Sequence, residues 1–207
     1  MLRMLDLAYE RALGGAPGLA SAQDLAKDYL SRGGNRAESV DALIRWQVAK
    51  AATSGFVTGV GGLLAIPVTL PLNVTSVLYV QVRMIGAIAW MGGYALDDDR
   101  VKTLSYICLC GNGAKEVLKS AGVALGQKLS RQAIQRLSQP MLARVNRAVG
   151  CRLLAHCGQT GLNLGRAMPL AGGLLGGALD AMMTRTVGIV AKRTFIDEVR
   201  QPLRTVP

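Results

Sequence analysis

Apolar and polar positions in residues 1–53 recur at the spacing of amphipathic helices. Leu25 and Tyr29 stand four residues apart on one face, with charged residues between them. Glycine-containing breaks at 14–17 and 33–35 divide the region. The pattern predicts three helices whose outer faces are polar.

Residues 54–96 form an apolar segment. The twenty-nine residues from Ser54 to Val82 contain no charge, whereas about 20 apolar residues suffice to cross a bilayer as a helix. Pro67 and Pro71 lie inside this run, and proline removes a backbone donor and restricts the residue before it. We therefore expect two shorter helices here. An alternation around residues 78–84 would also fit a strand, but an element of about 20 residues is longer than strands usually are.

A polar stripe crosses this apolar segment. At about 100° per residue, Asn73, Ser76 and Arg83 fall on one side of a helix. A buried arginine needs a partner, because an unpaired buried charge is very costly. Asp180 interrupts the apolar stretch 167–183 and is the carboxylate that we expect to pair with Arg83, either as a structural ion pair or as a polar site.

Residues 97–157 are expected to form basic helices. The three aspartates at 97–99 precede a new apolar run and are predicted to cap a helix start, since the further ligands of a calcium loop are absent. Residues 115–139 have the pattern of a basic amphipathic helix, which we expect to end at Pro140. The cations expected to face an anionic surface are Lys115, Lys119, Lys128, Arg131, Arg136, Arg144, Arg147 and Arg152.

Residues 158–207 are predicted to form a second glycine-rich apolar segment and a C-terminal helix. The whole chain, residues 1–207, is predicted to be one all-α domain, a glycine-rich helical bundle with two apolar helical segments. Apolar side chains expected to contact lipid are Phe56, Leu63, Leu64, Ile66, Leu170, Leu174 and Leu175.

Composition and charge indicate where the protein is located and which kind of partner it binds. Half of the residues are apolar and 18% are charged, with a net charge of +11. Residues 1–100 balance nine Lys and Arg against nine Asp and Glu, so the excess belongs to residues 101–207, with fifteen against four. Charges within the first ten residues exclude an uninterrupted secretory signal, which favours a cytoplasmic location.

No constellation for catalysis or metal binding is evident. His156 is the only histidine, and neither a nucleophile elbow nor a phosphate-binding loop accompanies it. The four cysteines are interpreted as buried free thiols of a reducing compartment, because their spacing suits neither a metal ion nor a disulfide framework. The sequence predicts no catalytic residue, no metal and no cofactor.

Several short stretches of the sequence, taken in order, resemble the EcsC family, which is named for a bacterial gene beside an ABC-transporter pair. The resemblance extends from about Tyr9 to Ile196. The stretches that carry it are residues 44–50, 71–74, 79–83, 92–94 and 172–180, continuing through Thr184 and Gly188. It implies a bacterial, helical, membrane-associated protein without established catalytic residues.

These observations favour a non-enzymatic protein that is peripheral to the inner face of the membrane and binds anionic lipid. Two alternatives stay open: a soluble interaction module whose basic half binds a protein or nucleic acid, and an integral or pore-forming protein. Nucleic acid is disfavoured because the basic half contains only Tyr106 and Phe195 as aromatic residues for stacking. The oligomeric state is left open.

Overall fold

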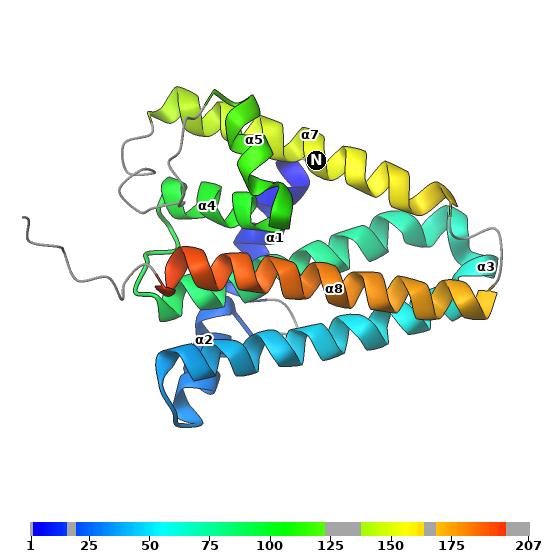
Figure 1. The fold of residues 1–207 in the computed structure, drawn as a ribbon, viewed down its shortest axis with the longest axis horizontal. Coiled ribbons are helices and arrows are strands. Elements are labelled where there is room, and N and C mark those ends of the chain that lie inside the picture. The colour runs from blue at the N-terminus through cyan, green and yellow to red at the C-terminus, as the bar shows by residue number, and fades with distance from the viewer. Residues whose placement is uncertain (1, 16–19, 123–137, 164–168, 198–207) are drawn as a thin grey trace, which may run out of the picture.

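The protein is an assembly of helices, as Figure 1 shows for the computed structural model. The structure describes residues 2–15, 20–122, 138–163 and 169–197, and within them residues 2, 4, 53–77, 154–163 and 169–176 by their backbone alone. The elements are α1 (Leu2–Gly14), α2 (Ala22–Ser31), α3 (Arg36–Met91), α4 (Asp99–Leu109), a 3₁₀ turn (Gly111–Gly113), α5 (Ala114–Ser120), α7 (Gln139–Asn163) and α8 (Pro169–Phe195). The predicted all-α class is confirmed.

Short polar side chains start three of these helices. The Ser21 hydroxyl accepts a hydrogen bond from the backbone N–H of Asp24 at the start of α2. Asn35 and Glu38 form a reciprocal capping box at the start of α3, and Asp98 caps α4. Such caps satisfy backbone donors that have no partner inside the helix. The predicted breaks between the N-terminal helices and the aspartate cap are thus confirmed.

Helix α3 doubles back on itself. Asp41, near its start, accepts two hydrogen bonds from Lys192 of α8, at 2.6 and 2.7 Å, and Gly92, which follows its last residue, lies against the backbone carbonyl of Phe195. A straight helix of 56 residues would hold its ends about 84 Å apart, so both ends could not reach the last turns of α8. Figure 1 shows the two arms of α3 running in opposite directions.

The prolines of the apolar segment do not interrupt α3, which continues from Arg36 to Met91. The predicted division into two separate helices is therefore wrong. Two arms exist nonetheless, because the chain turns between them. We refer to residues 36–52 as the first arm and to residues 78–91 as the second arm.

Helix α8 packs against both arms. Along the first arm it runs antiparallel, since Asp41 meets Lys192 and Ile44 meets Gly188. Along the second arm it runs parallel, since Gln81 meets Thr184 and Gly92 meets Phe195. Met84, Ile85, Ile88 and Phe195 are fully buried in the core that results.

The predicted basic helix over residues 115–139 is wrong. Helix α5 ends at Ser120, and Gly122 has a φ of +74°, a left-handed conformation that commonly terminates helices. Pro140, expected as a stop, lies instead in the first turn of α7. Proline is tolerated there because the first-turn N–H groups have no partner within the helix anyway.

Candidate membrane-facing end and cationic surfaces

The parts of the helices that contain few charges meet at one end of the molecule. No charged residue lies between Lys50 and Arg83 in α3, and Arg166 is the only one between Arg152 and Asp180. Figure 1 places the turn of α3, the C-terminal end of α7 and the N-terminal end of α8 together at the right of the view. We call this region the charge-poor end.

On α7 and α8, the charges that border the charge-poor end lie equally far from the ends of their own helices. Arg152 stands eleven residues before the end of α7 at Asn163, and Asp180 stands eleven residues after the start of α8 at Pro169. At ~1.5 Å per residue, each lies about 16 Å from its helix end. One leaflet contributes about half of the ~30 Å hydrocarbon core of a bilayer. On α7 and α8, the charge-poor part is therefore about as long as one leaflet is deep.

Three large apolar side chains are exposed near this border. Trp46 is 53% exposed on the first arm, and Leu179 and Met182 are 37% and 68% exposed on α8. The seven residues predicted to contact lipid are in α3 and α8, but their side chains lie outside the described part of the structure. Their contacts are not established.

Five of the cations predicted to face an anionic surface lie on α5 and α7. Lys115, Lys119, Arg144, Arg147 and Arg152 are all exposed. Arg144 and Arg147 border a shallow hollow of about 460 Å³ beside the end of α5. Arg152, whose guanidinium packs against Gly113, is the nearest of the α7 arginines to the charge-poor end. Lys128, Arg131 and Arg136 lie outside the described residues.

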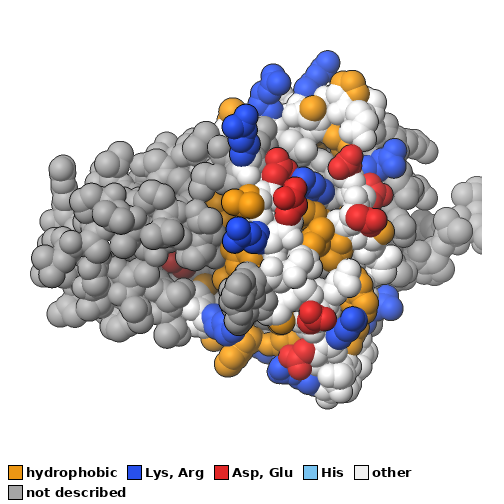
Figure 2. Space-filling view, turned by 180° about the vertical axis from the view of Figure 1, so that it is seen from behind, with side chains coloured by type: hydrophobic (Ala, Val, Ile, Leu, Met, Phe, Trp, Pro, Cys, Tyr) orange, Lys and Arg blue, Asp and Glu red, His pale blue; other side chains and the backbone are white. Residues whose placement is uncertain are grey.

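Cations also occur on other faces. Figure 2, seen from the side opposite to Figure 1, shows acidic and basic side chains mixed over the described surface. Balanced charges weaken the field of that face, so an anionic partner is not expected to bind there.

Arg83 is buried, as predicted, but its partner is different. The residue is 5% exposed, and its guanidinium donates a hydrogen bond to the backbone carbonyl of Ala20 at 3.0 Å. Gln81 faces α8, and Arg83, two residues later, points about 200° away around the helix. No ion pair joins Arg83 to Asp180 among the described residues, so the predicted pair is wrong.

The two residues of the predicted pair, Asp180 and Arg83, have different surroundings. Asp180 is half-buried, and burial raises the pKa of its carboxyl above the ordinary value of 3.8. The Nε of Arg83 has no hydrogen-bond partner. Asn73 and Ser76 belong to α3, but their side chains lie outside the described part. The expected polar stripe of Asn73, Ser76 and Arg83 therefore stays a prediction.

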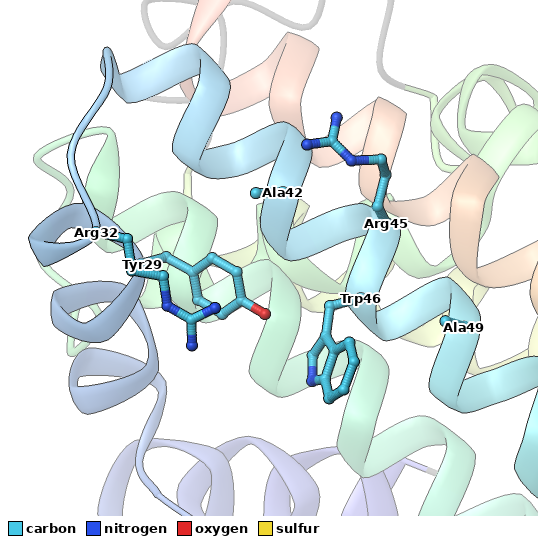
Figure 3. Close-up of a pocket in the computed structure, with 6 residues that line it drawn as sticks. All are labelled: Tyr29, Arg32, Ala42, Arg45, Trp46 and Ala49. Carbon is cyan, nitrogen blue, oxygen red and sulfur yellow. The ribbon is translucent and has the colours of Figure 1, made fainter.

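An aromatic hollow between α2 and the first arm was not predicted. It has a volume of about 530 Å³ and is lined by Tyr29, Arg32, Ala42, Arg45, Trp46 and Ala49. In Figure 3 the rings of Tyr29 and Trp46 lie on opposite sides of the hollow, whereas Arg45 points away from Trp46. The sequence signal was the spacing of Ala42, Trp46 and Ala49, four and three residues apart, which places two short side chains beside an indole on one helix face.

The thiols are free but differ in exposure. Cys108 is buried and Cys110 is half-buried, and burial raises their pKa values to about 12 and about 11. A high pKa suppresses the reactive thiolate. Cys151 is exposed, which corrects the prediction that the cysteines are buried. Cys157 and the side chain of His156 lie outside the described part.

Within the described ranges, no three His, Cys, Asp or Glu side chains gather as a metal site would require. Among the helices as described, none is both long and apolar enough to span a bilayer.

Comparison of the chain with protein-family models, with curated proteins and with solved structures found no match. The resemblance to the EcsC family stays a prediction.

Proposed function

We propose that the protein attaches peripherally to an anionic membrane surface through its charge-poor end and acts there as a non-enzymatic, lipid-binding protein. The observation that supports this most directly is the convergence of the charge-poor parts of α3, α7 and α8. Apolar side chains are stabilised when they leave water for the acyl boundary of a membrane.

The bordering cations supply the attraction to headgroups. Lys50 on the first arm and Arg152 on α7 are exposed and are the charges that border the charge-poor parts of these two helices. A lysine or arginine near an anionic surface contributes about 1 kcal/mol to binding. Arg144 and Arg147 lie farther along α7 from the charge-poor end and act at longer range, where salt screens them.

Peripheral attachment is favoured over a crossing because the charge-poor parts of α7 and α8 are each about 16 Å long, whereas a crossing needs about 30 Å. A cytoplasmic location at the inner face, where anionic lipids and reduced thiols coexist, belongs to the same proposal.

Liposome flotation tests the proposal. We expect the protein to float with vesicles that contain phosphatidylglycerol, more than with neutral phosphatidylcholine vesicles, and less at high salt. The double variant Lys50→Glu/Arg152→Glu should bind anionic vesicles at least about 30-fold more weakly, since two cations contribute about 2 kcal/mol.

The matched control is Lys27→Glu/Arg193→Glu, which changes the net charge equally. Both residues are exposed, and they lie on α2 and in the last turn of α8, away from the charge-poor end. Its binding should fall by less than about threefold. Equal losses in the two variants would contradict docking through this end, and absence of flotation with every vesicle would contradict membrane attachment itself.

A further inference from the structure

Asp180 is the charge that limits the charge-poor part of α8. The eleven helical residues before it, Pro169 to Leu179, carry no charge, and the next charge after it is Arg185. While Asp180 is ionised, the uncharged part of the helix is about 16 Å long, at ~1.5 Å per residue. When Asp180 is protonated, the uncharged part extends to Thr184 and is about 24 Å long. One proton therefore lengthens the uncharged part of α8 by about half.

The Asp180 side chain lies on the packed side of α8. It stands four residues before Thr184 and seven before Val187, which are buried and share its face of the helix. Asp180 is half-buried, and no cation in the part of the chain that the structure describes forms an ion pair with it. Burial without a cation disfavours the ionised form of a carboxyl, which agrees with the raised pKa of Asp180.

The elements packed against α8 bring no opposite charge to this carboxylate. Asp41 of the first arm and Cys108 of α4 face α8, but their contacts lie at least twelve residues beyond Asp180, about 18 Å along the helix. The 3₁₀ turn contacts α8 next to Cys110. Burial raises the pKa of that thiol to about 11, so the thiol is neutral at neutral and acidic pH.

The titratable groups of α3 that lie closer to the level of Asp180 point elsewhere. On the first arm, the Lys50 ammonium lies over the exposed ring of Trp46. On the second arm, Tyr79 and Arg83 stand two residues before and after Gln81, which faces α8, so both point away from that helix. The state of Asp180 therefore depends on its surroundings more than on a paired charge.

We infer that Asp180 is a proton-controlled limit on how far α8 enters the membrane. The ionised carboxylate stops docking at its own level, and the protonated carboxyl lets the helix enter as far as Arg185. The inference rests on the proposed function and adds to it regulation by pH. About 24 Å is still shorter than the ~30 Å hydrocarbon core, so the attachment stays peripheral.

The direction of the pH effect follows from the cost of the charge. An ionised carboxylate is costly in an acyl layer, so the docked protein favours the protonated form. Docking is therefore coupled to the uptake of a proton. By linkage, the affinity for the membrane rises as pH falls through the pKa that the carboxyl has in the docked protein.

A tryptophan at position 182 reports the depth of docking. Met182 is 68% exposed and stands two residues after Asp180. Met182→Trp combined with Trp46→Phe and Trp90→Phe leaves one tryptophan in the chain. In phosphatidylglycerol vesicles with brominated acyl chains, its emission should be quenched more strongly at about pH 5 than at about pH 7.5. Adding Asp180→Asn should give strong quenching at both values, because asparagine is uncharged.

The affinity for phosphatidylglycerol vesicles provides a second readout. Between about pH 7.5 and about pH 5, wild-type binding should tighten about tenfold, which corresponds to a pKa one unit higher in the docked protein. Asp180→Asn should remove most of this change. Asp97→Asn is the matched control for the titration of other carboxyls, because Asp97 is exposed and follows the end of the second arm, away from the charge-poor end. It should retain the change.

His156 also titrates in this range, and its side chain lies outside the described part of the structure. A pH effect that His156→Gln removes and Asp180→Asn retains would overturn the inference in favour of the histidine. Equal quenching at both pH values, in protein that floats with the vesicles, would overturn it while the proposed function stands. No flotation at either pH would overturn both.

Discussion

Two glutamines are buried in different environments, although their side chains are identical. Gln81 is 3% exposed, and its Nε2 donates a hydrogen bond to the Thr184 hydroxyl at 3.3 Å. Gln47 is 1% exposed, and neither atom of its amide has a hydrogen-bond partner. A buried amide without partners costs about 1–3 kcal/mol. Gln47 therefore opposes folding, whereas Gln81 joins the second arm to α8.

Replacing each glutamine with methionine tests this difference. Gln47→Met should raise the free energy of unfolding by about 1 kcal/mol, because it removes an unpaired polar group at similar volume. Gln81→Met should lower it by about 1 kcal/mol, since Thr184 loses its partner. Urea denaturation measures both. A loss for Gln47→Met as large as that for Gln81→Met would show that the Gln47 amide is paired.

At the level of elements, the close approach of α3 and α8 depends on a glycine. A Cβ added to Gly188 would lie 2.9 Å from Cγ1 and 3.0 Å from Cγ2 of Ile44. Those atoms are near the backbone of a branched side chain and have little freedom to move. Gly188 therefore allows α8 to pack against the first arm.

We expect Gly188→Ala to lower the free energy of unfolding by about 1–3 kcal/mol through overpacking. Ile44→Ala removes the atoms that an added Cβ would meet, so the double variant should lose less than the sum of the two single losses. Thermal and urea unfolding would measure the coupling. Gly14→Ala is the control, because a Cβ there would meet nothing within 4 Å. Strict additivity would contradict a direct contact.

At the scale of the whole molecule, α1 is joined to a helix almost a hundred residues later in the chain. Asp6 lies 2.8 Å from the Nζ of Lys102 and accepts a hydrogen bond of 2.8 Å from the Tyr106 hydroxyl. The Tyr9 hydroxyl donates to the Leu96 carbonyl at 2.8 Å, and the rings of Tyr9 and Tyr106 meet edge to face. The N-terminal helix is therefore part of the bundle.

This connection predicts a pH dependence. Partial burial would raise the pKa of the Asp6 carboxyl, but the hydrogen bonds from Lys102 and Tyr106 outweigh it and hold the pKa below 3.8. A lowered pKa in the folded state stabilises the protein above the unfolded value, and this stabilisation is lost as pH falls through the folded pKa.

The measurable quantity is the difference in free energy of unfolding between the wild type and Asp6→Asn. It should favour the wild type by at most about 1 kcal/mol at neutral pH, since the pair is partly exposed, and it should shrink below pH 3.8. A difference that does not change with pH would show that the charge of Asp6 is not involved.

Local signals predicted the helical class, the break at residues 33–35 and the aspartate cap of α4. Ser21, Asn35 and Asp98 act within three residues of themselves, because a cap requires only its own first turn. Gly92 likewise marks the end of α3. Where a boundary depended on Pro140, the same chemistry permitted either a stop or a start, and only the packed chain distinguishes them.

The sequence alone determined where charges are absent, since that is a property of residue order. Only the tertiary structure decided that these stretches meet at one end. Helix α3 doubles back, and α8 contacts both of its arms through residues that are more than a hundred positions away in the chain. The direction of Arg83 and the hollow beside Trp46 were decided in the same way. Helix caps depend on neighbours in sequence, whereas the partners of a buried or exposed side chain depend on which distant surfaces the core brings together.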